Sequence, residues 1–175
     1  MKQIITFPKY LAIVITLLFM SCKKESTQNS DSLTSGTSRI SFNFSPAFQG
    51  SSSYSSNYPA VNRVLTYSIG TLKQIALRTE EPASVNAKVV GLSIFVDQAA
   101  TTSTGNITLD LNGSSTTAGS AILSLGSASG DFTSTNGTAT ITKLNSTDIE
   151  GTFSCTISDG TNNYSLTNGT FAAKF

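Results

Sequence analysis

The chain has 175 residues, enough for one folded domain. It carries 11 basic and 10 acidic side chains and no histidine, so its formal net charge is +1. This balance argues against a nucleic-acid partner, which requires a basic stripe. The missing histidine excludes His-dependent triads and the commonest zinc and general-base sites.

The first 21 residues have the three parts of a secretory signal peptide. Lys2 and Lys9 supply positive charge, and residues 11–20 are apolar apart from one threonine. This run is shorter than the roughly 20 apolar residues of a permanent membrane helix. The segment 18–22 (Leu-Phe-Met-Ser-Cys) resembles a bacterial lipobox. We therefore expect cleavage after Ser21 and acylation of Cys22 by palmitate-like chains.

Residues 22–37 form the next expected segment, a disordered tether. They begin with Lys23-Lys24-Glu25 and continue with Ser, Thr, Gln, Asn and Asp around a single leucine. Such a composition buries too little apolar surface to fold. Several acyl chains on Cys22 would hold the tether stably on a bilayer, which one chain does not. The folded domain is expected over residues 38–175.

Alternation of apolar and polar residues, the signature of half-buried strands, recurs through the expected domain. It runs over residues 40–45, 72–78, 90–96, 107–111, 138–142, 149–157 and 164–175, and residues 121–125 form a further short apolar run. We predict an all-β domain with a single antiparallel sandwich or barrel of seven to nine short strands. The pattern leaves the choice between sandwich and barrel open.

Turn residues separate these runs. Asn112-Gly113, Asn136-Gly137 and Asp159-Gly160 tolerate the positive φ of hairpin turns. The hairpin at Asp159-Gly160 is the most firmly predicted, because alternating runs flank it on both sides. At Asn168-Gly169 the alternation changes phase, which predicts a β-bulge or a tight bend.

Residues 45–60 read as a long loop rich in serine and aromatic residues, and long loops are often functional. Exposed tyrosines suit binding surfaces because they join a flat apolar face to a polar tip. We therefore name Phe48, Tyr54, Asn57 and Tyr58 as candidate ligand-binding residues. The more conservative interpretation is a mobile loop whose tyrosines fold back onto the sheet edge.

Other chemistry has weaker support in the sequence. Two carboxylate pairs, Asp148 with Glu150 and Glu80 with Glu81, could serve glycoside hydrolysis, but they are typical of a solvated strand face and a charged turn. A calcium site over residues 159–163 would offer few of the six to eight oxygens required. Cys155 is expected to be a buried, unreactive thiol without a disulfide partner. We predict no cofactor, no metal and no catalytic residue.

Three C-terminal segments are similar to an uncharacterised family of Bacteroidota outer-membrane lipoproteins with one β-rich domain. They are residues 137–144 (Gly-Thr-Ala-Thr-Ile-Thr-Lys-Leu), 149–154 (Ile-Glu-Gly-Thr-Phe-Ser) and 166–175 (Leu-Thr-Asn-Gly-Thr-Phe-Ala-Ala-Lys-Phe). The resemblance covers about residues 119–175 and implies a lipid anchor in the outer membrane. It also implies a possible surface-export signal at residues 23–25 and a candidate O-glycosylation site at Ser32. It implies no catalytic activity.

These features together predict a membrane-anchored, non-enzymatic protein whose β-domain binds a glycan or a peptide at the cell envelope. The alternative is a structural or accessory subunit of an envelope complex, and a carboxylate-dependent hydrolase is less favoured. The expected partners are the bilayer, through acylated Cys22, and a glycan or an envelope protein. The sequence leaves the membrane face, periplasmic or extracellular, undecided.

Overall fold

A computed structural model of the chain describes residues 33–56, 63–81, 86–100, 106–113 and 116–175. The described part is all-β, as predicted, with ten strands against the expected seven to nine. The strands are β1 (Thr37–Phe48), β2 (Ser51–Ser55), β3 (Arg63–Ile69), β4 (Leu72–Glu80), β5 (Val89–Asp97), β6 (Ile107–Asp110), β7 (Ser120–Ser127), β8 (Gly130–Leu144), β9 (Asp148–Ser158) and β10 (Asn163–Lys174). A single turn of 3-10 helix, η2 (Gln98–Ala100), follows β5.

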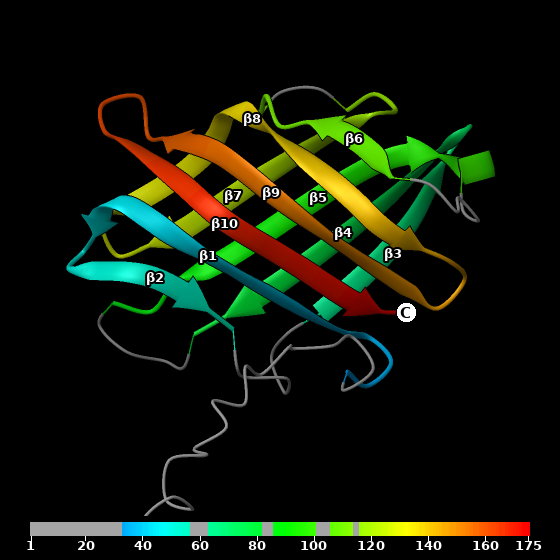
Figure 1. Ribbon diagram of the computed structural model, residues 1–175, viewed down its shortest axis with the longest axis horizontal. Helices are drawn as coiled ribbons and strands as arrows, with labels where there is room; N and C mark the ends of the chain where they lie inside the picture. Colours follow the sequence, from blue (N-terminus) through cyan, green and yellow to red (C-terminus); the bar gives the residue numbers. More distant parts are fainter. Residues whose placement is uncertain (1–32, 57–62, 82–85, 101–105, 114–115) are drawn as a thin grey trace, which may run out of the picture.

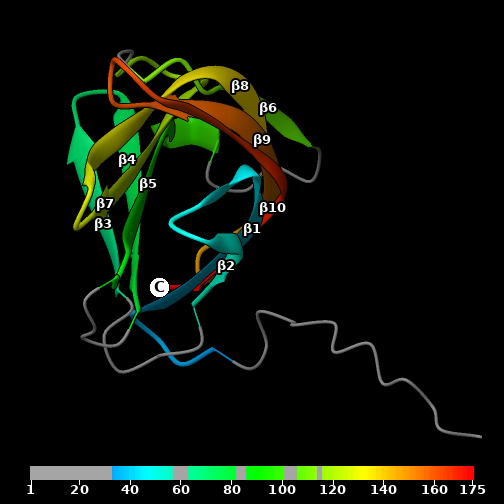
Figure 2. The ribbon, with the colours of Figure 1, turned by 90° about the vertical axis from the view of Figure 1, so that its left-hand side faces the viewer.

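The ten strands form one sheet in the order β2-β1-β10-β9-β8-β6-β7-β5-β4-β3 (Figure 1). Neighbouring strands run antiparallel, apart from one parallel bridge between β6 and β7. The long strand β8 pairs with β7 through its first half and with β6 through its second half. The sheet curls into a half-barrel. β3, β4, β5 and β7 make one wall, and β8, β9, β10 and β1 face them from the other (Figure 2).

The predicted turns have mixed outcomes. The hairpin at Asp159-Gly160 joins β9 to β10, and the bulge at Asn168 is confirmed by a register shift after Leu166 and a φ of 53° at Asn168. The predicted turn at Asn136-Gly137 is wrong, because both residues lie inside β8. A Cβ at Gly137 would lie 2.5 Å from the Cα of Cys155, so the glycine permits close strand contact there.

The turn predicted at Asn112-Gly113 does not make a hairpin either. These residues follow β6, whose pairing with β7 is limited to the parallel bridge between Asp110 and Ser120. Both β6 and β7 instead lie along β8, one beside each half of that strand. The connection therefore carries the chain between two neighbours of β8.

Strand β1 crosses the ends of the opposite wall. At its start, the Ser38 hydroxyl lies between the carbonyl oxygens of Arg63 (2.8 Å) and Arg78 (2.9 Å), and its one O–H donates to this pair. Just beyond its end, Gln49 Nε2 donates to the Ser129 hydroxyl (2.8 Å) in the β7–β8 turn. These side-chain bonds hold the curl together where the edge strands do not pair.

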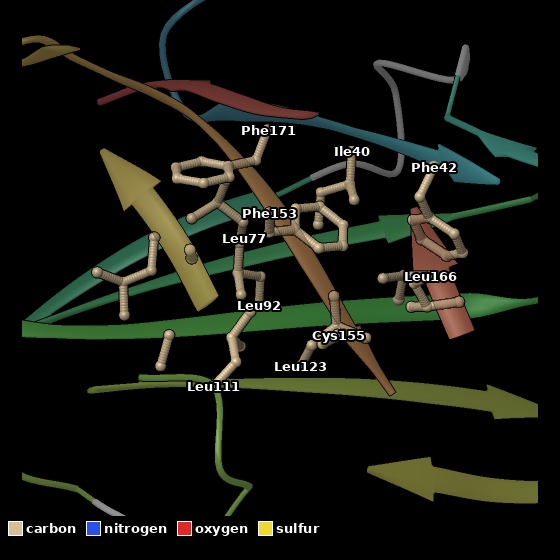
Figure 3. Close-up of a cluster of buried hydrophobic side chains, with 14 of the residues drawn as sticks. Ile40, Phe42, Leu77, Leu92, Leu111, Leu123, Phe153, Cys155, Leu166 and Phe171 are labelled. Atoms are coloured by element: carbon tan, nitrogen blue, oxygen red, sulfur yellow. The ribbon is translucent and has the colours of Figure 1, made fainter. Parts of the chain in front are cut away.

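Side chains from both walls meet inside the curl (Figure 3). Leu77, Leu92 and Leu123 come from β4, β5 and β7, while Phe42 and Phe153 come from β1 and β9. All five are at most 5% exposed. The interior is therefore a packed core, formed by the apolar residues of each alternating strand.

Residues 33–36, which lie in the predicted tether, contact the β-domain. Leu33 is buried, Gly36 N donates to Lys174 O (2.7 Å), and the Ser35 hydroxyl donates to Phe175 O (2.6 Å). Residues 33–36 are thus attached to the end of β10. Only residues 22–32 of the expected tether lie outside the described part of the chain.

Candidate functional site: a groove on the outer face

A groove of about 1220 Å³ lies on the outer face of β3, β4, β5 and β7 and reaches the start of β8. We call these four strands the groove wall. Outward positions of its paired strands fall into rows that cross the sheet. One row contains Leu65, Ala76 and Ser93, and the next contains Arg78, Gly91, Ser124 and Thr133.

Small residues form the floor of the groove. Ala76, Gly91, Ser93, Ser124 and Gly126 project at most one heavy atom beyond Cβ, so the sheet surface is hollow between the larger residues around them. A Cβ at Gly91 would lie 2.8 Å from Ser124 Oγ. Glycine within a strand often marks a place where a ligand or another backbone approaches closely.

Charged side chains stand at two sides of the groove. The Arg78 guanidinium pairs with Glu80 at 2.7 Å, and neither Arg63 nor Asp131 has an ion pair within the described residues. One cation and one anion are thus available to a ligand, while the groove as a whole is electrically balanced. Together with the hydroxyls of Ser93, Ser124 and Thr133, they offer donors and acceptors to a polar, uncharged molecule.

Two large apolar side chains stand on the outer face beside the groove. Leu65 is 51% exposed and Tyr67 is 49% exposed, more than any other large hydrophobic residue whose exposure the structure describes. Both belong to the edge strand β3. Leu65 lines the groove, and Tyr67 lies one outward row beyond it, where its ring offers a flat face outside the groove lining.

The aromatic loop predicted as a ligand site is mostly part of the core. Residues 45–48 complete β1, and residues 51–55 form β2, so much of the expected loop is a hairpin. Phe48 is fully buried and Tyr54 is 1% exposed. The proposal that these two rings form an exposed platform is therefore wrong. Asn57 and Tyr58 lie outside the described residues.

Tyr54 has a structural role that explains its burial. Its ring stacks on Phe42 with centroids 5.1 Å apart, and its hydroxyl lies 2.8 Å from the Thr79 hydroxyl on β4. Burial raises the pKa of Tyr54 above its ordinary value, and the hydrogen bond to Thr79 only partly offsets this. The side chain thus connects β2 to the opposite wall.

Both carboxylate pairs considered for hydrolysis lie in ion pairs. Lys143 Nζ lies 3.0 Å from Glu150 Oε1 and 3.9 Å from Asp148 Oδ2. Asp148 lies on the same side of β9 as Glu150, as predicted, because Lys143 reaches both, but it is buried and not solvated as expected. The hydrogen bond from the Thr147 hydroxyl, followed by the nearby Lys143, holds the pKa of Asp148 below its usual range.

The second carboxylate pair flanks the end of β4. Glu80 pairs with Arg78, and Glu81 pairs with the buried Lys88 at 3.3 Å. The Lys88 backbone N–H also donates to Glu81 (3.1 Å), so this ion pair fastens the connection between β4 and β5. The two glutamates therefore point to separate partners.

The proposed calcium loop is a hydrogen-bonded turn. Asp159 Oδ1 accepts from the backbone N–H groups of Thr161 (2.8 Å) and Asn162 (2.6 Å), and these bonds lower the pKa of Asp159. The hairpin alone accounts for this aspartate. Within the described ranges, no group of three or more His, Cys, Asp or Glu side chains comes together as a candidate metal site.

Cys155 is buried on the inner face of β9, as the alternation predicts. Burial raises the pKa of its thiol to about 12. The thiolate is the reactive form of cysteine, so the folded chain protects this residue from reaction.

The opposite wall carries a different outer surface. Its strands β6, β8, β9, β10, β1 and β2 present hydroxyl residues at facing positions, so we call them the hydroxyl wall. One row crosses all six strands through Thr108, Thr140, Thr152, Thr170, Ser41 and Ser55. Cross-strand pairs of this kind stabilise a sheet. The hydroxyls of Ser41 and Thr170, for example, lie 2.7 Å apart.

The groove itself was not found from the sequence. The sequence feature that could have revealed the groove is a series of small residues at outward strand positions: Gly91, Ser93, Ser124 and Gly126. In an alternating strand, such positions are normally interpreted only as solvent-facing. Cys22, the predicted lipid site, and Ser32, the predicted O-glycosylation site, lie outside the described residues.

Comparisons of the chain with protein-family models, curated proteins and solved structures found no match. Among the residues that the structure describes, no helix has the length and apolar character needed to cross a membrane. The functional argument therefore depends on the groove and on the sequence.

Proposed function

We propose that this chain is a lipid-anchored binding protein of the bacterial cell envelope whose β-domain holds an extended, uncharged glycan in the groove. The observation that carries the proposal is the groove itself, with its floor of small residues and its hydroxyl groups. Sugars present many hydroxyls on a flat ring, and a shallow polar floor beside an exposed tyrosine complements both features.

The anchor is the second part of the proposal. Cys22 bears the acyl chains, and the tether over residues 22–32 connects them to the domain, which starts near Leu33. We place the protein in the outer membrane, on the basis of its resemblance to Bacteroidota lipoproteins. Radiolabelled palmitate should enter the native chain but not a Cys22→Ser variant, and loss of the label should accompany loss of membrane attachment.

A non-enzymatic role fits the chemistry of the described residues. The carboxylates that a glycoside hydrolase would use are held by Lys143, Lys88 and Arg78. Of the carboxylates along the groove, Glu80 is paired with Arg78, which leaves Asp131 without a second free carboxylate to act with it. The groove thus favours binding over hydrolysis.

A groove-filling substitution with a matched control tests the proposal. Ser124→Tyr places a large side chain on the groove floor, while Ser154→Tyr makes the same change at an exposed position on β9 of the hydroxyl wall. We expect Ser124→Tyr to weaken binding of envelope polysaccharides, measured by calorimetry, by about tenfold or more, or about 1.4 kcal/mol. We expect Ser154→Tyr to leave the affinity unchanged.

Three outcomes would decide against the glycan. If Ser124→Tyr and Ser154→Tyr changed the affinity equally, the groove would not be the binding surface. If no envelope polysaccharide bound, the ligand would not be a glycan. If extended peptides bind instead and Ser124→Tyr blocks them, the ligand class is peptide. A structural role in an envelope complex is the second candidate, favoured by the exposed Leu65 and Tyr67 on an edge strand.

A further inference from the structure

Strand β3 is an edge of the sheet, and its free side has a defined set of backbone groups. Val64 N donates to Gly36 O (3.1 Å), which lies away from β4. Successive residues of a strand direct their backbone groups to alternate sides, so Thr66 and Ser68 also face the free edge. Among the described strands, none pairs with β3 on this side. Edges of this kind can pair with another chain.

The residues of β3 lack the features that usually prevent such pairing. From Val64 to Ser68 the strand has no charged residue, no proline and no register shift against β4. Leu65 and Tyr67, the two exposed large hydrophobic residues, both lie on its outer face. The other edge strand, β2, is shorter and presents only serines to solvent. The two edges are therefore not equivalent.

From these features we infer that β3 pairs antiparallel with β3 of a second copy, about a twofold axis at Tyr67. In this register Thr66 of each copy lies opposite Ser68 of the other, and the two pairs exchange four backbone hydrogen bonds. The hydrogen bond between Val64 N and Gly36 O is retained in the dimer, so residues 33–36 do not have to move. The axis leaves Tyr67 opposite Tyr67 of the second copy.

Side chains and charges agree with this register. The two Tyr67 rings form a cross-strand aromatic pair, and Leu65 lies diagonal to Tyr67 of the second copy. Arg63, the one charged residue of β3, lies beyond Val64, whose free side is already occupied by Gly36, so it is outside the paired segment and the two arginines stay apart. No like charges face each other, and each exposed apolar residue gains an apolar neighbour from the other copy on its edge side while its outer side stays accessible.

The pairing also deepens the proposed function, on which this step depends. A twofold axis perpendicular to the sheet keeps both outer faces on the same side, so the two grooves become parts of one continuous surface. A long polysaccharide could then occupy both grooves, and its second contact would be intramolecular, which raises the overall affinity. The dimer itself does not require a glycan.

Cysteine crosslinking in cells tests the register on the full chain. Only a residue on the axis faces its own copy, and closely facing strand residues have the Cα separation that a disulfide needs. We expect Tyr67→Cys to give a disulfide-linked dimer on non-reducing gels, several-fold more than Leu65→Cys or Ser154→Cys. The native chain, with Cys155 buried, gives the background.

A proline variant supplies the second arm. Thr66→Pro removes an N–H that faces the free edge and leaves the pairing of β3 with β4 intact, so the fold tolerates it. In the Tyr67→Cys background it should abolish the crosslink. Equal crosslinking of Tyr67→Cys and Ser154→Cys, persistence after Thr66→Pro, or an adduct with a different protein would overturn the inference. If the dimer is absent, the monomer should still bind a glycan. Failure of the dimer can therefore be distinguished from failure of the proposed function.

Discussion

The groove wall and the hydroxyl wall differ on both of their faces. Inside, the groove wall contributes aliphatic side chains, whereas the hydroxyl wall contributes most of the aromatic rings. Phe42 contacts three rings, with centroids 5.0 Å from Phe44, 5.1 Å from Tyr54 and 5.8 Å from Phe153, and Phe48 also contacts three. Outside, the groove wall carries the groove of about 1220 Å³ with exposed apolar side chains at its edge, while the hydroxyl wall has smaller hollows of about 430 and 550 Å³ lined largely by threonine and serine.

This difference indicates that the two walls have different roles. Rings in edge-to-face and stacked contact have preferred geometries, so the aromatic cluster fixes how β1 and β2 cross the opposite wall. Aliphatic side chains lack such directional preferences, and the groove wall is held by strand pairing and the shared core. The expected consequence is that stability depends most on the hydroxyl wall, whereas ligand binding depends on the groove wall.

The largest expected effect comes from removing the central ring of the aromatic cluster. Phe42→Ala should lower the free energy of unfolding by about 3–5 kcal/mol, because it loses buried surface and leaves a cavity. Leu92→Ala, a fully buried residue of β5, is the matched truncation in the other wall. Urea unfolding followed by circular dichroism measures both. A larger loss for Leu92→Ala would contradict the assignment of stability to the aromatic wall.

The link between the two walls is tested by Tyr54→Phe. This variant keeps the stacked ring but leaves the buried Thr79 hydroxyl without its partner, which should cost about 1–3 kcal/mol. Glycan affinity should not change, because Tyr54 is in the core. Weaker binding at unchanged stability would instead restore Tyr54 as a ligand-binding residue.

Cys155 gives the hydroxyl wall a sensitivity to alkaline pH. Its thiol has a pKa of about 12 when folded and near 9 when exposed. The unfolded chain therefore loses this proton first, so stability is complete below pH 9 and falls as pH rises toward 12. At pH 10 the expected loss is about 1.4 kcal/mol.

Denaturant unfolding between pH 8 and pH 10 measures this slope, and Cys155→Ala should flatten it. The range stops at pH 10 because above it the Tyr54 hydroxyl, whose ordinary pKa is 10.0, would dominate the pH dependence of the free energy of unfolding. In the native chain, a thiol reagent should react with Cys155 only on unfolding. Rapid reaction in the folded state would show that the inner face of β9 is open to solvent.

Sequence patterns predicted those parts of the fold whose causes are local. The β9–β10 hairpin follows from Asp159, whose carboxylate binds the turn that it begins, and the bulge follows from Asn168. Strand β3 was missed because its apolar residues lie on both faces, with Leu65 and Tyr67 outside and Val64 in the core. Strand β2 was missed because four of its five residues are serine.

The site could not be predicted because its causes are distant in the chain. Tyr54 is buried by partners on β1 and β4, and a hydrophilic neighbourhood of serines conceals this in the sequence. Gly137 looks like a turn residue, yet it serves contact with Cys155, 18 positions away. The groove likewise arises only when β5 and β7 bring Gly91 beside Ser124.

The smallest expected effects separate the two outer surfaces most directly. Thr152→Val on the hydroxyl wall and Ser93→Val in the groove each replace one outward hydroxyl by a methyl-bearing side chain. Surface changes of this kind shift stability by about 0.5 kcal/mol or less, so neither variant should unfold. Calorimetric titration with a polysaccharide should show weaker binding for Ser93→Val and none of that loss for Thr152→Val. The reverse result would assign binding to the hydroxyl wall, where a row of four threonines and two serines crosses six neighbouring strands.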